Sequence, residues 1–201
     1  MTYPAIQSGI IGAMIAMVAA PALAADSLPQ TGCYERVYDA AHLAAHKGQF
    51  VVRTRVEIVS PFDEQLQDKT TKTPIVANAD FRVWVRGRKL RFESYGACTA
   101  EGGALACGGS VSAAEDDFCD HNKPGVHDCR VDAADAGDFN IEVRPEGILL
   151  TIVKRLELLY EGSDSGPYLN LVEADAENHT FLLTRTGEVC RPGNAPQDSK
   201  K

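Results

Sequence analysis

The feature that most constrains the fold of this chain is a stretch from Phe81 to Cys107 that reads as two consecutive β-hairpins. At its start, apolar and polar side chains alternate strictly. Successive side chains of a strand point to opposite faces, so this alternation indicates a half-buried strand. A two-residue turn at Gly87-Arg88 sets the register, and a slip by one residue would turn every apolar side chain outward. The predicted cross-strand pairs are Val85 with Leu90, Trp84 with Arg91, Val83 with Phe92 and Arg82 with Glu93.

The second hairpin predicts a disulfide. With Gly102-Gly103 as its two-residue turn, Cys98 lies opposite Cys107. The alternation counted from the turn makes them a non-hydrogen-bonded pair, with Cα atoms roughly 4.5 Å apart. That distance is at the near edge of the disulfide range of about 4.4–6.8 Å. The alternative, in which each of these Cys residues bonds elsewhere, stays open.

Further segments with strand-like patterns and turn signals recur at short spacing, and one short helix precedes them. Asp39 is the expected N-cap of a helix over Ala40 to Lys47, and Gly48 is its stop. The pattern predicts an antiparallel sandwich or small barrel of hairpins, stabilised by disulfides. The remaining predicted strands are Phe50 to Val59, Phe139 to Val143, Ile148 to Tyr160, with a bend at Lys154-Arg155, and a last hairpin of Tyr168 to Glu173 with Thr180 to Thr184.

The six Cys residues favour disulfides over zinc, because no CxxC pair and no finger-like His spacing is present. Fifteen connectivities are formally possible for six Cys. Besides Cys98–Cys107, we expect Cys119–Cys129, which are close in sequence, and Cys33–Cys190, which would join the ends of the domain. Disulfides persist in oxidising compartments.

The N-terminus also predicts export. An apolar run from Ile10 to Ala24 is broken by Pro21 and ends in a small-x-small pattern, although no Lys or Arg precedes it. We expect a signal peptide over residues 1–25, a single β-rich domain over 26–190 and a disordered tail over 191–201. A stable membrane span after cleavage is not expected. The predicted location is the periplasm or the exterior of the cell.

An acidic segment over about residues 108–137 interrupts the strand pattern and reads as a long loop. Within it, His121 and His127 flank a Pro-Gly turn near several Asp residues, a set that could bind a divalent cation. No EF-hand spacing is present. The alternative is an ordinary solvated acidic loop.

His42 and His46 are four residues apart on one face of the predicted helix, a spacing that lets two imidazoles reach one metal ion. A metalloprotease motif would need Glu directly after the first His, and Leu43 stands there. The alternative is that His46 complements the helix C-terminus while His42 packs. The metal candidates are therefore His42, His46, His121 and His127, and no other cofactor is expected.

A basic stripe follows the polar face of the first hairpin. The net charge of −8 argues against nonspecific nucleic-acid binding. In so acidic a chain, a local concentration of cations around an aromatic ring could receive an anionic ligand or an acidic partner. The alternative is an ordinary solvated face. The candidate residues are Arg82, Trp84, Arg86, Arg88, Lys89 and Arg91.

Two runs carry a resemblance to a known group: Cys33 to His46, followed by Gln49 and a strand, and Gly96 to Cys107. Both are similar to segments of a group of uncharacterised secreted proteins of alphaproteobacteria, and together they cover about half the chain in pieces. That group has a Cys-Asp-Gly-Gly run after the second hairpin, where this chain has its acidic segment. The resemblance implies a periplasmic location and no function.

Motifs of catalysis are missing: the sequence has no nucleophile elbow, phosphate loop or dinucleotide fingerprint. If every Cys is paired, no thiol is free to act as a nucleophile. We therefore expect an exported binding or accessory module that is not an enzyme, with an unknown partner. The alternatives are a divalent-metal-binding protein and an inhibitor of a periplasmic hydrolase such as lysozyme, the latter by analogy with small disulfide-bearing barrels.

Overall fold

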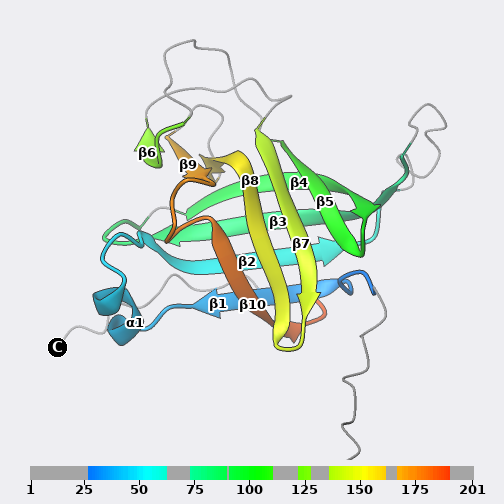
Figure 1. Cartoon of the computed structure of the whole chain (residues 1–201), viewed down its shortest axis with the longest axis horizontal. Coiled ribbons are helices and arrows are strands. Elements are labelled where there is room, and N and C mark those ends of the chain that lie inside the picture. The colour runs from blue at the N-terminus through cyan, green and yellow to red at the C-terminus, as the bar shows by residue number, and fades with distance from the viewer. Residues whose placement is uncertain are drawn as a thin grey trace, which may run out of the picture.

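The strands close into an eight-stranded antiparallel β-barrel with one short helix at its end (Figure 1). The computed structural model describes residues 27–62, 73–89, 91–110, 122–127, 136–161 and 167–190. A mainly β-barrel fold is one of the two architectures predicted from the sequence. The elements are β1 Gly32–Val37, α1 Ala40–Ala45, β2 Val51–Val59, β3 Ile75–Val85, β4 Arg91–Glu101, β5 Ala104–Ser110, β6 Gly125–His127, β7 Gly137–Arg144, β8 Gly147–Tyr160, β9 Tyr168–Val172 and β10 Thr180–Gly187.

Strand β8 closes the barrel. Around the wall the strands follow the order β10, β1, β2, β3, β4, β5, β7 and β8, and β8 then pairs with β10. The second half of β8 turns away to pair with β9, which in turn carries β6, and its last residues reach β4. Closure leaves the eight wall strands without a free edge, so their backbone polar groups are paired between neighbours.

A bulge lets β8 change partners along its length. Asp138 of β7 pairs with Val153, but Gly137 pairs with Leu156, so the two residues between them have no counterpart. Lys154 has a positive φ of 61°, and Gly137 passes so close that a Cβ there would lie 2.1 Å from the carbonyl oxygen of Arg155. The bend predicted at Lys154-Arg155 is therefore present, and a glycine on the neighbouring strand makes room for it.

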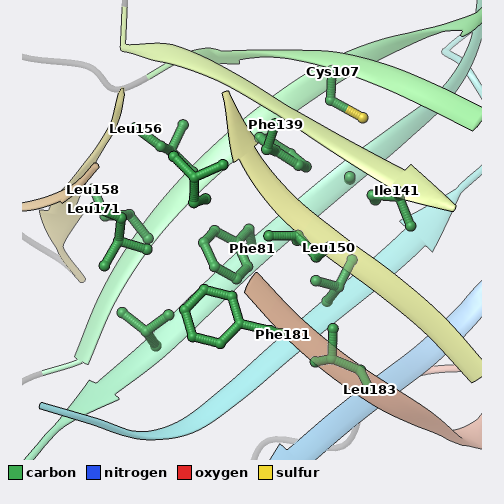
Figure 2. Close-up of a cluster of buried hydrophobic side chains, with 14 of the residues drawn as sticks. Phe81, Cys107, Phe139, Ile141, Leu150, Leu156, Leu158, Leu171, Phe181 and Leu183 are labelled. Atoms are coloured by element: carbon green, nitrogen blue, oxygen red, sulfur yellow. The ribbon is translucent and has the colours of Figure 1, made fainter. Parts of the chain in front are cut away.

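Apolar side chains from all around the wall fill the barrel interior (Figure 2). Phe81 lies near its centre, with ring centroids 5.8 Å from Phe139 and 6.1 Å from Phe181, and all three rings are fully buried. Leucines of β8, β9 and β10 surround them. The strand pattern that alternates in the sequence therefore sends its apolar half inward and its polar half to the outer wall.

Both predicted hairpins have the expected pairing. Arg82 is opposite Glu93, Val83 is opposite Phe92, and Cys98 is opposite Cys107. The first turn is shifted by one residue, because the N–H of Arg88 donates to Val85 O and thereby centres the turn on Arg86-Gly87 rather than Gly87-Arg88. Gly87 supplies the positive φ of 69° that this turn requires.

Several local predictions were wrong. The helix ends at Ala45 instead of Lys47, although Asp39 is its N-cap. The first strand, β1, was not predicted, and the acidic segment contains β6, so it is not one uninterrupted loop. The last hairpin does not form: β9 and β10 each pair with a different part of β8. A bulge in β2 places Val51 in the core.

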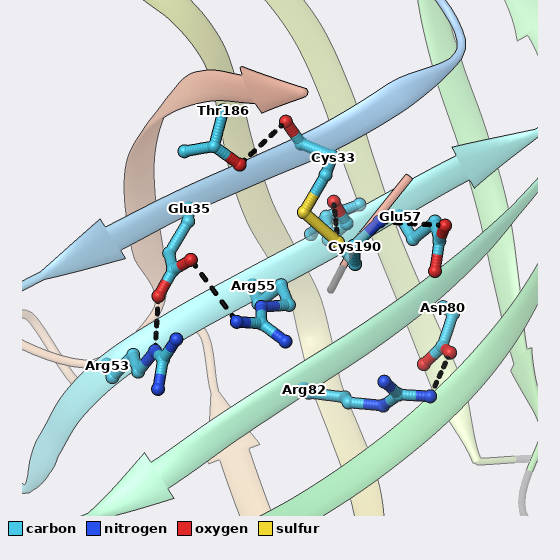
Figure 3. The surroundings of a disulfide bond; sticks show 10 residues. Cys33, Glu35, Arg53, Arg55, Glu57, Asp80, Arg82, Thr186 and Cys190 are labelled. Atoms are coloured by element: carbon cyan, nitrogen blue, oxygen red, sulfur yellow. Dashed lines mark hydrogen bonds and ion pairs between the residues drawn. A yellow bond between two sulfur atoms is a disulfide. The ribbon is translucent and has the colours of Figure 1, made fainter. Parts of the chain in front are cut away.

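Two disulfides join described residues, and both were predicted. Cys98–Cys107 links β4 to β5 with Cα atoms 4.0 Å apart, slightly closer than the expected 4.5 Å. Cys33–Cys190 links β1 to the end of the described chain, with Cα atoms 4.9 Å apart (Figure 3). The predicted Cys119–Cys129 pair lies outside the described residues.

Asn178 ties the loop before β10 to the start of β2. Its side chain is fully buried, and its Oδ1 accepts hydrogen bonds from the N–H groups of Phe50 and Val51 at 3.0 and 3.1 Å. Its Nδ2 donates to Gly48 O and to Asp175 Oδ2. One side chain thus satisfies backbone groups more than a hundred residues away, at the barrel end that carries α1.

The two disulfides should contribute unequally to stability. In the chain-entropy model a cross-link stabilises more when it closes a longer loop. Cys33–Cys190 spans 157 residues and Cys98–Cys107 only 9. Replacing the first pair by Ala should lower the free energy of unfolding by about 5 kcal/mol, and replacing the second pair by about 3 kcal/mol, in denaturant titrations. An equal or reversed ranking would contradict this expectation.

Removing the Asn178 amide should be costly. Asn178→Ala leaves two buried backbone N–H groups without an acceptor, which should lower the free energy of unfolding by about 3 kcal/mol in urea titrations. Asn140→Ala, at a half-buried position of β7, is the matched control and should change it by less than about 1 kcal/mol. Similar losses in the two variants would show that Asn178 does not hold the loop.

Candidate functional site

The outer face of β1–β4 carries a continuous row of charged side chains. Glu35 is opposite Arg55 across β1 and β2, Arg55 is opposite Arg82 across β2 and β3, and Arg82 is opposite Glu93 across β3 and β4. Two arginines thus meet in the middle of the row, with a carboxylate at each end. Opposite charges on neighbouring strands attract, whereas the two arginines would repel without their carboxylates.

Trp84 lies on this face, but its ring is covered by neighbouring charged side chains. The carboxylate of Glu35 accepts hydrogen bonds from Arg53 and Arg55 (Figure 3). These two guanidinium groups lie over the Trp84 ring, at 4.5 and 5.5 Å from its centroid. Trp84 is only 4% exposed. Its ring face is therefore engaged within the protein by cation–π contacts and is not offered to a partner.

Arg82 bridges two carboxylates beside a partly buried phenol. It donates to Asp80 Oδ2 and to Glu93 Oε2. Burial raises the pKa of Asp80 above its ordinary value of 3.8; Arg82 lowers it, and Glu93 and Glu57 raise it further. Burial also raises the pKa of Tyr95, and the nearby Asp80 carboxylate adds to that effect. The net result is a carboxyl group that resists ionisation despite its arginine.

The turn between β3 and β4 exposes three cationic side chains, Arg86, Arg88 and Lys89, which we call the basic turn. Arg86 is anchored at the end of α1, where its Nη2 donates to Leu43 O at 3.0 Å and to His46 O at 3.4 Å. A cation at a helix C-terminus satisfies carbonyls that have no partner within the helix. One of the three cations of the basic turn, Arg86, is therefore held against the barrel end.

The predicted basic stripe is thus divided into parts with different surroundings. Arg82 is paired with acidic neighbours, and Arg91 forms an ion pair with Glu161 of the segment after β8. Trp84 is buried. Only the basic turn presents several exposed cations together, so it is the part of the stripe best placed to meet an anionic partner.

His42 and His46 stack on each other, with ring centroids 4.3 Å apart, and Tyr38 stacks on the other side of His42 at 4.9 Å. The Nε2 of His42 shares a hydrogen bond with the buried Gln49 Oε1 at 2.8 Å. The Nδ1 of His46 lies 3.6 Å from Glu177 Oε1. Each imidazole therefore already has a polar partner within the protein, and metal binding by this pair stays a prediction.

The structure does not describe the side chains of the other two metal candidates. His121 lies outside the described residues, and His127 belongs to β6 without a described side chain. Within the described ranges, no group of three or more His, Cys, Asp or Glu side chains is arranged to hold a metal ion. No metal geometry can therefore be assigned to these residues.

Sequence reasoning missed most of the acidic half of the outer face. Glu35 was overlooked because β1 was not recognised as a strand, and Asp80 because β3 begins six residues before the predicted start at Phe81. The alternation of charges in Arg53, Arg55 and Glu57 was an available signal for a polar strand face. The partners of these charges lie on other strands, so pairing them required the sheet register.

Comparison with family models, with curated proteins and with solved structures found no match. In the part of the chain that the structure describes, no helix has the length and apolar character needed to cross a membrane.

Asp80→Asn should change how stability depends on pH. Because the folded-state pKa of Asp80 lies above 3.8, its stabilising contribution is present below that value and is lost as pH rises through the folded-state pKa. Asn cannot ionise, so the melting temperature of the variant minus that of the wild type should be more positive at neutral pH than at acidic pH. Asp138→Asn, at an exposed carboxyl, controls for the removal of one charge. A difference that does not vary with pH would contradict the role of burial.

Proposed function

We propose that this protein is an exported, non-catalytic binding module of the periplasm or cell exterior, and that it contacts an anionic partner through the basic turn. The observation that carries the proposal is the anchoring of Arg86 on the carbonyls of α1, which holds the basic turn in a fixed position. A rigid cluster loses less conformational entropy on binding than a mobile one.

The two disulfides support the proposed location outside the cytoplasm. Disulfides indicate an oxidising, extracytoplasmic environment, and here they join both a tight hairpin and the two ends of the described domain. The apolar run before residue 25 supports export of the chain. The finer location, periplasm or exterior, is part of the proposal.

The filled interior supports a surface role. Many small barrels bind a ligand inside, but here Phe81, Phe139 and Phe181 occupy the centre. A partner would therefore meet the outer wall or the loops. Among the exposed features there, the basic turn is the densest group of cations in a chain whose net charge is −8. A local concentration of positive charge on an otherwise acidic protein steers an anionic partner to that place.

The proposal is tested by retention on a heparin matrix at low ionic strength. The wild-type protein should be retained in spite of its negative net charge and should elute as salt screens the contact. The triple variant Arg86→Ser, Arg88→Ser, Lys89→Ser should pass through.

A matched control removes three cations elsewhere, by Lys123→Ser, Arg144→Ser and Arg185→Ser. Both triple variants change the net charge from −8 to −11 through the loss of three positive charges. Retention of the control together with loss of the basic-turn variant supports a local contact. Elution of both variants at the same salt concentration would remove the basic turn from the proposal.

The two alternatives, metal binding and inhibition of a hydrolase such as lysozyme, receive no specific support. His42 and His46 are engaged with Gln49 and Glu177. For lysozyme inhibition the only ground is the shared architecture of a small disulfide-bearing barrel.

A further inference from the structure

An open pocket lies on the outer wall where β3 and β4 meet the end of β5 and β8, on a different part of the wall from the basic turn. Its volume is about 260 Å³, below the range of about 300–1,000 Å³ that is usual for drug-sized ligands. A single small ring fits that size better than a long chain does. The pocket is lined by Asp80, Arg82, Glu93, Ser94, Tyr95, Ser110 and Leu159.

Its polar groups offer donors and acceptors side by side. Arg82 has five N–H donors, and its recorded hydrogen bonds go from Nη2 to Asp80 Oδ2 and from Nε to Glu93 Oε2. The guanidinium has five donors and each carboxyl group has two oxygens, so these groups have more hydrogen-bonding capacity than the two bonds between them use. A hydroxyl group both donates and accepts, so a ligand with neighbouring hydroxyls matches this arrangement.

The hydroxyl of Tyr95 is a second, independent sign of a ligand. It is buried and has no hydrogen-bond partner among the described residues. Tyr95 is directly opposite Asp80 in the β3–β4 register. A buried hydroxyl without a partner costs about 1–3 kcal/mol, and such a group in a pocket is satisfied when a ligand supplies the missing bond.

An aromatic surface adjoins the polar groups. The ring of Phe62 is parallel to that of Tyr95 within 3°, with centroids 6.1 Å apart, and Phe62 is 52% exposed. The C–H face of a sugar ring is apolar and packs on such rings, while its hydroxyl edge bonds to polar groups. The combination of an aromatic surface with carboxylates and an arginine therefore fits a saccharide better than a purely apolar ligand.

The charged groups of the pocket lining narrow the class of ligand further. The lining holds two carboxyl groups, Asp80 and Glu93, and one guanidinium, Arg82. The raised pKa of Asp80 favours its neutral form, so the acidic and basic groups of the lining are close to balance. Such a lining favours neither an anion nor a compact cation, which leaves neutral hydroxyl-rich molecules. We propose that this pocket binds one ring of a neutral saccharide, with Tyr95, Arg82 and Glu93 bonding to its hydroxyls and the ring of Tyr95 beside it.

The experiment is a titration of the ¹⁵N-labelled protein, followed by amide chemical shifts, with glucose, N-acetylglucosamine and mannose up to tens of millimolar. At least one should shift the amides of residues 80–82 and 93–95, with a dissociation constant on the order of 1 mM. Glucuronate, the anionic analogue of glucose, should bind at least about tenfold more weakly than the best neutral sugar, because its carboxylate would lie beside Glu93 and would discourage ionisation of Asp80.

Two conservative variants and one control locate the site. Tyr95→Phe keeps the ring but removes the hydroxyl, and Glu93→Gln keeps the shape but removes a charge; each should weaken the best sugar at least about fivefold. Glu142→Gln alters an exposed carboxyl of β7 that pairs with Arg144, and should bind as the wild type does. Spectra of the free variants establish that each is folded.

Three results would overturn the proposal. One is the absence of shifts at these amides with all three neutral sugars, and another is binding of glucuronate as tight as that of the best neutral sugar. The third is unchanged affinity in Tyr95→Phe and Glu93→Gln. None of these results bears on the heparin experiment, because the basic turn lies outside the pocket, so the two proposals fail separately.

Discussion

The pairing of β8 with both β7 and β10 is the interaction on which the rest of the barrel depends. Without it the sheet would be open, and two long edges would expose unpaired backbone groups. Closure in turn encloses Phe81 and its neighbours, which give the barrel its packed centre. The bulge at Lys154 allows one strand to finish the wall and then leave it for β9. Past the bulge, Leu156 pairs with Gly137 of β7 on one edge and with Leu171 of β9 on the other.

The barrel wall separates apolar side chains on its inner side from charged side chains on its outer side. Its inner side is apolar and closely packed, and its outer side on β1–β4 is a set of charges paired across strands. The Cys33–Cys190 bond holds the end of the described chain over this outer side, where Cys190 N–H donates to Glu57 Oε1 (Figure 3). The Glu35 pairs with Arg53 and Arg55 are largely buried, whereas the Arg82 pairs are more exposed and contribute less to stability. Their importance here is that they decide which polar groups are left for a partner.

Among the described residues, two outer surfaces carry the proposals made above. The basic turn offers cations held in place by α1, and the pocket beside Tyr95 offers mixed donors and acceptors near an aromatic ring. They differ in charge and size, and the partners we propose for them differ accordingly: an anionic surface in one case and a small neutral ring in the other.

The sequence by itself determined the local pairings. Period-two alternation and a short turn specify the register around Phe81 and of Cys98 with Cys107, because a slip would expose apolar side chains. Only the tertiary structure decided the distant pairings, such as β1 with β10, and the pocket built from Asp80, Tyr95 and Leu159. The backbone hydrogen bonds that join distant strands are the same for almost any side chains, so sequence patterns do not choose the partner. Barrel closure and the bulge in β8 make that choice.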